Sequence, residues 1–279
     1  MKIVYSPKCL KYSQSGHPES PARIANSYAR LRETYEFVAP NEILDEEILR
    51  VHSKSLFDAV KTGRFVDADS PAYPDIHAYA TLSAAAAVTA CRLSLGGETA
   101  LSLMRPPGHH AGKDFLGGFC YFNNVAIAVA SALREVKRVA ILDFDCHHGN
   151  GTQNIFLGRD DVLYVSLHQS PLYPGTGLRS ERNCLNHPLP AGTDEAAYME
   201  TLVQAINSVK AFSPDLIAVS AGFDTYRGDP LAGLQLEITS YEKIGRMINE
   251  LRKPTLAVLE GGYARDLPEC IDSFLRGLR

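Results

Sequence analysis

Short apolar runs alternate with longer helical patterns along this chain, and this alternation restricts the fold more than any other feature. Runs that are β-branched or leucine-rich, and that end near Gly, Pro, Asp or His, predict buried strands at Lys2–Tyr5, Thr99–Leu103, Val139–Phe144, Val162–Leu167, Leu216–Ser220 and Thr255–Leu259. Helical patterns occupy Ala78–Leu95, Asn123–Glu135, Glu195–Phe212 and Ser240–Leu251, with Asp194 and Thr239 as expected N-caps. Strands alternating with helices predict an α/β fold whose parallel strands are covered by helices.

The sequence carries no sign of a domain boundary. Its 279 residues contain no internal repeat and no low-complexity linker. The composition is that of a globular protein, with 45% hydrophobic and 22% charged residues, which is enough to form one sizeable core. We therefore expect a single domain over residues 1–279.

Charge, hydropathy and cysteine spacing exclude several protein classes. The net charge is -4 and there is no run of Lys and Arg, so direct binding to nucleic acid is not expected. The N-terminus has no apolar signal region, and the stretch Ala80–Ala90 is too short to span a bilayer. The six cysteines form no C-x-x-C pair, which predicts free, mostly buried thiols. We expect a cytoplasmic protein without a membrane partner.

The segment Val139–Gln153, VAILDFDCHHGNGTQ, places carboxylates and imidazoles at the end of an apolar strand. Charged groups are costly to bury without a partner, so this pattern indicates a functional site. Because strand side chains alternate, Asp143, Asp145 and His147 are expected on one side. A carboxylate and an imidazole are suitable zinc ligands, so Asp145 and His147 can share one metal ion.

A catalytic zinc site needs three protein ligands and one open position, so a third ligand must come from another segment. The best candidate is Asp224 in VSAGFDTYRGDP, which follows the expected strand Leu216–Ser220 in a glycine-containing loop. An isolated Asp of this kind is more often a turn residue or a helix cap. Asp224 becomes a candidate only in the company of the other polar segments.

Two further segments suggest catalytic groups. His109 and His110 lie in RPPGHHAG, after the expected strand Thr99–Leu103. They could be ordinary polar loop residues, but imidazole titrates near neutral pH and could act as a general base with Asp143 as its carboxylate partner. Tyr263 follows Gly261 and Gly262 after the last expected strand. It could simply pack against the core, or it could donate a hydrogen bond to an oxyanion.

Together these segments resemble the histone deacetylase family, which includes the acetylpolyamine amidohydrolases and the bacterial and archaeal deacetylase-like enzymes. The resemblance runs through most of the chain, in the ordered motifs GHPESPARI, RPPGHHAG, GGFCYFNN, DFDCHHGNGTQ, VSLHQSPLYPGTG, AGFDTYRGDPLAG and EGGY. It implies the three-layer arginase/deacetylase fold, with a central, mostly parallel sheet flanked by helices. It also implies an active zinc-dependent amidohydrolase.

The resemblance assigns roles to individual positions. It makes Asp145, His147 and Asp224 the ligands of one catalytic Zn²⁺. His109 and His110 become the general base and acid pair, with Asp143 orienting His109. Tyr263 becomes the oxyanion donor.

The resemblance also implies a structural K⁺ ion and a substrate tunnel. The K⁺ ion would be held by Asp143, Asp145, Ser166 and the backbone of Leu167. In the tunnel, Phe119 and Tyr173 would flank a lysine-like alkyl chain, with Gly118 as a backbone acceptor.

Two positions bear on chemistry and substrate. The partner expected for His110 is Asn150, where class I enzymes have Asp and class II enzymes commonly have Asn. An amide leaves His110 less basic than a carboxylate would, which favours unequal roles for the two histidines. Polyamine-selective relatives can place an acid just after GDP, where this chain has Leu231. We therefore rank acyl-lysine in a protein or peptide above an acetylated small amine as the substrate.

Two alternative functions stay open. An arginase-like hydrolase shares the fold but needs two manganese ions bridged by further carboxylates, and HHGNGTQ has Gly and Asn where such bridges are expected. A non-catalytic acyl-lysine-binding protein would keep the pocket without turnover. Such a protein would usually lose the tyrosine or a zinc ligand, and this sequence retains both. The oligomeric state is not predicted.

Overall fold

The computed structural model describes residues 1–279 and is built around one sheet of eight strands. The strands are β1 (Lys2–Val4), β2 (Glu36–Val38), β3 (Ala100–Ser102), β4 (Val139–Asp143), β5 (Val162–Gln169), β6 (Cys184–Leu189), β7 (Leu216–Ala221) and β8 (Thr255–Leu259). Their order across the sheet is β2-β1-β3-β8-β7-β4-β5-β6, and every neighbouring pair is parallel.

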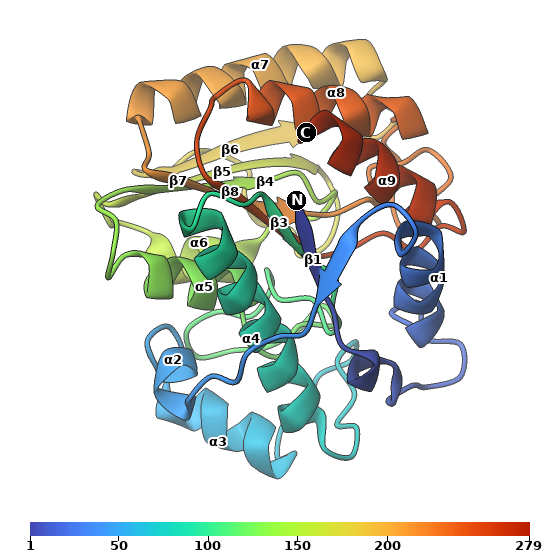
Figure 1. The fold of residues 1–279 in the computed structure, drawn as a ribbon, viewed down its shortest axis with the longest axis vertical. Helices are drawn as coiled ribbons and strands as arrows, with labels where there is room; N and C mark the ends of the chain where they lie inside the picture. Colours follow the sequence, from blue (N-terminus) through green and yellow to red (C-terminus); the bar gives the residue numbers. More distant parts are fainter.

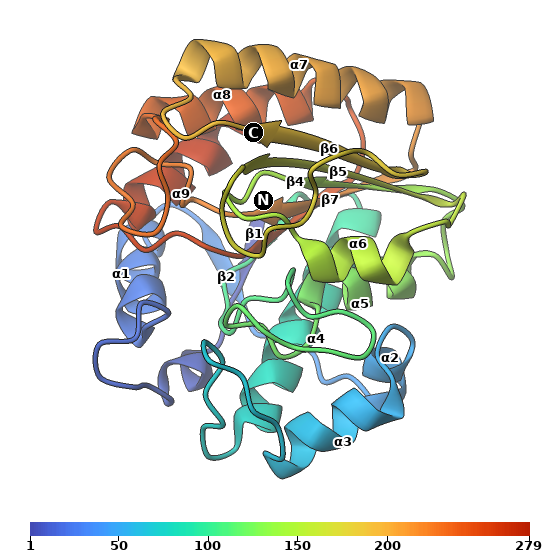
Figure 2. The ribbon, with the colours of Figure 1, turned by 180° about the vertical axis from the view of Figure 1, so that it is seen from behind.

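Helices cover both faces of this sheet and complete a three-layer α/β architecture (Figure 1). They are α1 (Pro21–Leu31), α2 (Asp45–Leu49), α3 (Lys54–Thr62), α4 (Ile76–Leu95), α5 (Asn124–Ala132), α6 (Asn150–Phe156), α7 (Glu195–Phe212), α8 (Ile238–Asn249) and α9 (Leu267–Gly277). Both views show α7 and α8 above the sheet and α4 and α5 below it (Figures 1 and 2). The terminal helix α9 packs between α8 and α1.

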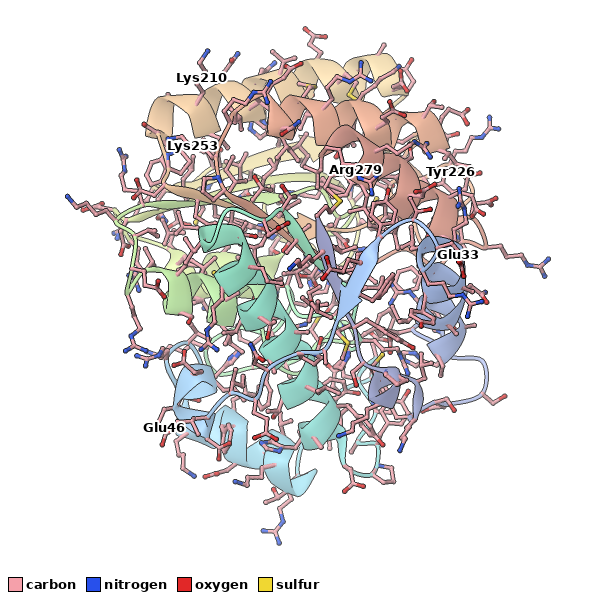
Figure 3. All side chains as sticks on the ribbon, viewed as in Figure 1. Glu33, Glu46, Lys210, Tyr226, Lys253 and Arg279 are labelled. Carbon is pink, nitrogen blue, oxygen red and sulfur yellow. The ribbon has the colours of Figure 1, made fainter.

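The central strands are buried on both faces, as their apolar runs predict. Every residue of β4, β5, β7 and β8 is buried, which is typical of parallel strands between two helical layers. The core is one continuous cluster of 71 buried residues. Charged side chains such as Glu33, Glu46 and Lys210 lie at the periphery (Figure 3). All six cysteines are free and buried, which confirms the expectation from their spacing.

The structure confirms the predicted strands and helices and adds several that were not predicted. The edge strands β2 and β6 and the helices α1, α2, α3 and α6 were not predicted, and no bounds were predicted for α9. Asp194 is the N-cap of α7, with its carboxylate accepting from the Ala197 amide at 3.0 Å. Thr239 as a cap was wrong, because α8 begins at Ile238. There Glu237 is the N-cap and forms a capping box with Ser240.

The helix α4 is 20 residues long, and its length and apolar composition alone would allow it to cross a bilayer. It is mostly buried in the structure and packs on α5, β1, β3 and β8. A core helix of a globular fold passes the same test of length and composition. The predicted helix Ala78–Leu95 began two residues after the observed start of α4.

Candidate active site

The polar motifs converge because they follow strands that are neighbours in the sheet. In parallel strands the carboxyl ends share one edge, which is where ligand sites of open α/β sheets form. The order β3-β8-β7-β4-β5 places five such ends side by side. The loops after these strands carry the histidine pair, Tyr263, Asp224, the Asp145–His147 segment and Tyr173 in that order.

Asp145, His147 and Asp224 form a compact group of possible metal ligands. One ligand atom from each lies within 4.8 Å of the others. The His147 Nδ1 atom is 3.1 Å from Asp145 Oδ1 and 3.0 Å from Asp224 Oδ2. In a tetrahedral zinc site with bonds of 2.0–2.1 Å, ligand atoms are separated by about 3.3 Å. These three residues therefore offer the donor types of a divalent metal site, and two of the three ligand separations are close to the tetrahedral value.

The path of the chain here differs from the expected continuation of a strand. The strand β4 ends at Asp143, so Asp145 and His147 are brought together by a turn and not by strand alternation. The turn is held by side-chain oxygens: the His147 amide donates to Asp145 Oδ1 at 2.9 Å, and the Cys146 amide donates to Asp224 Oδ1 at 2.8 Å. Asp224 thus orders the very segment that supplies the other two ligands.

Close backbone approach fixes the Asp145 carboxylate from the opposite side. The Gly261 amide donates to Asp145 Oδ2 at 2.8 Å. A Cβ atom on Gly261 would lie 2.3 Å from Asp224 Oδ2 and 2.7 Å from Asp145 Oδ2, so no larger residue fits without displacing a carboxylate. This contact explains the first glycine of the EGGY motif.

The buried carboxylates carry the electrostatic signature of a cation site. Asp145 and Asp224 are both 0% exposed. Burial and the neighbouring charge of Asp145 raise the pKa of Asp224 to about 7. Burial also raises the pKa of Asp143. Several buried acids are costly in a low-dielectric interior unless a positive charge compensates them, which a metal ion would supply.

The two histidines lie side by side but have opposite electrostatic environments. His109 Nδ1 is 3.1 Å from Asp143 Oδ2. Burial lowers the pKa of His109, but the carboxylates of Asp145 and Asp143 outweigh it and raise the pKa to about 10. For His110, burial and the adjacent charges of His109 and His147 hold the pKa well below its ordinary value. These environments favour the charged form of His109 and the neutral form of His110.

The partner of His110 defines its tautomer. His110 Nδ1 lies 2.8 Å from the Asn150 side-chain oxygen, at the first residue of α6. Because that oxygen can only accept, Nδ1 carries the proton and Nε2 is left as a proton acceptor. The contacts of His109 with Asp143 and of His110 with Asn150 are those that the sequence indicated.

Glu260 is a site residue to which the sequence analysis gave no role. It follows β8 and is fully buried, and its Oε2 accepts hydrogen bonds from the amides of Gly108 at 2.7 Å and His109 at 3.1 Å. Its Oε1 accepts from Ser220 Oγ at 3.2 Å. Glu260 thereby anchors the loop that carries the histidine pair. No side-chain pattern reveals such a role, because the donors are mainly backbone amides.

A buried ion pair joins the first motif of the chain to the histidine loop. Arg105 is fully buried and donates to both carboxylate oxygens of Glu19 at 2.7 Å. It also donates to the carbonyls of Cys9 and Tyr12. Each nitrogen of this guanidinium therefore donates to an oxygen, as a buried arginine requires.

His52 supports the same loop from the helical layer below. Its Nδ1 lies 2.8 Å from the Gly112 carbonyl, and its Nε2 accepts from the Asn123 amide at 2.8 Å. These contacts join RPPGHHAG to GGFCYFNN. Burial lowers the pKa of His52 from 6.5 to about 4.

Stability is expected to fall with decreasing pH through His52. The folded protein keeps this imidazole neutral down to about pH 4, while the unfolded chain binds a proton below about pH 6.5. The free energy of unfolding is therefore highest above pH 6.5 and falls as the pH decreases from 6.5 to 4, because only the unfolded chain gains a proton in this range. The slope is about 1.4 kcal/mol per pH unit. Denaturant unfolding at about pH 7 and pH 5 should show a loss about 2 kcal/mol larger for the wild type than for His52→Gln. Equal losses in the two proteins would contradict this assignment.

Tyr263 is held next to the metal-ligand group by its backbone and its ring. Arg23 donates to the carbonyls of Gly262 and Glu260, both at 2.6 Å, and its guanidinium lies 4.7 Å from the centre of the Tyr263 ring. The Phe119 ring meets the Tyr263 ring edge-on at 5.7 Å. Tyr263 therefore lies in the same pocket wall as one of the expected tunnel residues.

A single pocket of about 240 Å³ leads to this group of residues. Its lining includes most of the predicted site, namely His109, His110, Gly118, Phe119, Asp145, His147, Tyr173, Leu231 and Tyr263. The remaining lining residues are Asp69, Pro107, Leu172 and Gly261. Of these, Pro107 and Leu172 were not predicted, since apolar wall residues carry no distinctive sequence signal.

Gly118 must be a glycine for two reasons. Its φ is +56°, and a Cβ atom would lie 2.5 Å from His110 Cδ2 and 2.9 Å from Tyr173 Cε1. The adjacent Phe119 also has a positive φ of 69°, and its amide donates to Ser70 Oγ at 3.0 Å. A side chain held in this unfavourable backbone region is common at binding sites.

Of the residues expected to hold K⁺, Asp143, Ser166 and Leu167 lie on the adjacent strands β4 and β5, and Asp145 lies in the turn that follows β4. Asp143 on β4 is paired in register with Ser166 on β5. Asp143, Asp145, Ser166 and Leu167 are all buried. The Tyr164 hydroxyl donates to Asp143 Oδ2 at 2.9 Å, so Asp143 links this layer to His109. A K⁺ ion at this position stays a prediction.

Comparisons with known proteins identify the family. The family model described as histone deacetylase domain matches residues 17–278. A probable deacetylase of Methanothermobacter thermautotrophicus is 39% identical over 303 residues, covering 100% of this chain and 90% of that protein. Acetylpolyamine amidohydrolase 2 of Pseudomonas aeruginosa is 45% identical over 184 residues, covering 62% of this chain and 53% of that protein.

A solved structure agrees over the whole chain. The acetylpolyamine aminohydrolase from Burkholderia pseudomallei superposes with a TM-score of 0.90 at 30% identity, covering 99% of this chain and 98% of that one. The eight-stranded parallel sheet with helices on both faces is thus the arginase/deacetylase fold. The chain belongs to the histone deacetylase family of amidohydrolases.

Proposed function

We propose that this protein is a zinc-dependent deacylase that hydrolyses the amide bond of an acetylated lysine side chain in a protein or peptide. The observation that carries the proposal is the pocket. Asp145, His147, the pair His109 and His110, and Tyr263 all line it, and Asp224 contacts His147. This combination supplies a metal site, a proton acceptor and a hydroxyl donor around one reacting carbonyl.

Asp145, His147 and Asp224 would hold the zinc ion. A bound zinc ion supplies Lewis acidity, which polarises an amide carbonyl and lowers the pKa of water. The Nε2 atom of neutral His110 accepts a proton as water attacks the carbonyl carbon, and then passes a proton to the amine as the C–N bond breaks. The products are acetate and the free amine. His109, held charged between Asp143 and Asp145, stabilises the negative charge that develops.

The side chains that line the pocket support a slender, aliphatic substrate arm. Phe119 and Tyr173 line it, and Leu231 adds an uncharged wall where an acid would favour a distant ammonium. An acetylated small amine is the second candidate substrate. It is favoured by relatives that carry the name acetylpolyamine amidohydrolase. We further propose K⁺ as a structural ion and a cytoplasmic location.

The substrate ranking is tested by measuring acetate release from an acetyl-lysine peptide and, in parallel, from acetylputrescine and acetylspermidine. Each rate is measured with and without a chelator. Higher kcat/KM for the peptide, abolished by the chelator and restored by zinc, is the expected result. Higher kcat/KM for either polyamine would reverse the ranking. Turnover of none of them, by zinc-loaded protein, would contradict the deacetylase proposal for these substrates.

A further inference from the structure

One buried carboxylate outside the metal-ligand group connects two walls of the pocket. Asp229 lies in the loop between β7 and α8 and is 6% exposed. Its two oxygens accept three backbone hydrogen bonds that come from two separate segments. No lysine or arginine pairs with it within 4 Å, so backbone amides are its only close polar partners.

The first segment is the loop that carries Tyr263. Asp229 Oδ2 accepts from the Tyr263 amide at 2.6 Å and from the Ala264 amide at 3.2 Å. Two successive amides can point at one oxygen because Gly262, with φ of +117°, turns the chain just before them. Hydrogen bonds to a charged acceptor are roughly twice as strong as neutral ones, so this contact fixes the backbone of Tyr263 firmly.

The second segment is the loop that carries Leu231. Asp229 Oδ1 accepts from the Leu231 amide at 2.9 Å. Leu231 and Tyr263 both line the pocket. The two oxygens of one carboxylate therefore hold the backbone of two residues that line the pocket, Leu231 and Tyr263.

Arg23 completes the restraint on Tyr263 from the other side. It holds the carbonyls that precede Tyr263, at Glu260 and Gly262, while Asp229 holds the amides of Tyr263 and Ala264. With its backbone fixed at both peptide groups, Tyr263 keeps only side-chain rotation. Misplacement of a catalytic group by about 1 Å can reduce the rate by about 100-fold, so such restraint has a catalytic consequence.

We propose that Asp229 is a positioning residue that acts through Tyr263 and couples its placement to the Leu231 wall. This inference rests on the proposed function, in which Tyr263 donates a hydrogen bond to the oxyanion. Asparagine at this position has only one accepting oxygen, because its NH₂ group cannot accept a hydrogen bond from an amide. Asp229→Asn can therefore keep the hydrogen bonds to at most one of the two segments.

The kinetic test is a double-mutant cycle with Asp229→Asn and Tyr263→Phe. Asp229→Asn alone is expected to lower kcat by about 10- to 100-fold while zinc content is unchanged. In the Tyr263→Phe background the same change is expected to lower kcat less than about twofold, because the group being positioned is already absent. Multiplicative losses, or wild-type kcat for Asp229→Asn, would overturn the proposal.

The matched control is Asp272→Asn. Asp272 is also a buried carboxylate that accepts three hydrogen bonds, from Arg30, Tyr35 and Arg276, but it lies on α9 away from the pocket. Its loss is expected to lower stability and to leave kcat within about twofold of the wild type. A comparable fall in kcat for Asp272→Asn would mean that general destabilisation explains the Asp229 result.

A second readout does not depend on turnover. Hydrogen–deuterium exchange of a peptide over residues 261–266 should be faster in Asp229→Asn than in the wild type and in Asp272→Asn, because the Tyr263 and Ala264 amides lose their acceptor. Unchanged exchange would overturn the positioning role. If the wild type were inactive on every acetylated amine, the proposed function would fail, and this exchange would still decide whether Asp229 holds Tyr263.

Discussion

Asp224→Ala is expected to abolish specific zinc binding and to lower kcat by about 1,000-fold or more. A metal ion contributes several kcal/mol to the transition state of amide hydrolysis, and each 1.4 kcal/mol corresponds to about a factor of 10 in rate. Asp224 also accepts the Cys146 amide, so its loss loosens the turn that presents the other two ligands. Elemental analysis of the purified protein and steady-state kinetics measure the two effects together.

The design separates loss of the metal from loss of the fold. Burial beside Asp145 raises the pKa of Asp224 to about 7, so removing this carboxylate takes an unfavourable charge out of the metal-free protein. Because the same change leaves the Cys146 amide without its acceptor, the two effects oppose each other, and the Asp224→Ala apoprotein is expected to keep a cooperative unfolding transition, which denaturant unfolding of both apoproteins measures. Full zinc occupancy in Asp224→Ala, or kcat near the wild-type value, would show that the metal is held elsewhere.

Asp215→Ala is the matched control at the other end of β7. Asp215 lies before β7, at the end opposite Asp224, and its carboxylate accepts from the amides of Lys137 and Arg138. Its removal is expected to leave zinc content and kcat unchanged. An equal loss of zinc in both variants would point to unfolding and not to a lost ligand.

The regular interior of this fold could be predicted from the sequence because its physical signal is local. The strands β4, β5, β7 and β8 are continuous apolar runs because they are buried on both faces. The edge strand β6, CLNHPL, mixes apolar and polar residues and includes Pro188, so it lacks that signal. The strand β2 has only three residues, which is too short for any pattern to show.

Some helices were missed although their signals are present. The helix α3 begins after Ser53, whose hydroxyl accepts from the Leu56 amide, and ends at Gly63 in the left-handed conformation. A serine N-cap and a glycine C-cap are standard boundary signals and would have predicted it. The helix α1 likewise begins with Pro21 at its first turn.

Part of the candidate site could likewise be predicted from the sequence, and part could not. The side chains that define the chemistry, such as Asp145, His147 and His109, could be found because ionisable residues at the ends of apolar strands are unusual. The groups that hold them, Glu260 and Asp229, could not be given roles. They act on backbone amides supplied by loops far away in the sequence, and only the folded chain brings those amides to them.

Tyr263→Phe is expected to lower kcat by about 100- to 1,000-fold and to leave zinc content and KM nearly unchanged. Loss of one oxyanion donor typically has an effect of this size, and it falls on kcat because the hydrogen bond forms only in the transition state. Phenylalanine keeps the ring contacts with Arg23 and Phe119, so the pocket wall should stay in place. The matched control is Tyr28→Phe, since Tyr28 stacks on Tyr5 from α1 and does not line the pocket. If Tyr263→Phe retained kcat within about threefold of the wild type, the oxyanion would have to be stabilised by the metal ion and charged His109 alone. The contacts of Asp229 and Arg23 with the Tyr263 segment would then serve the shape of the pocket and not the chemical step.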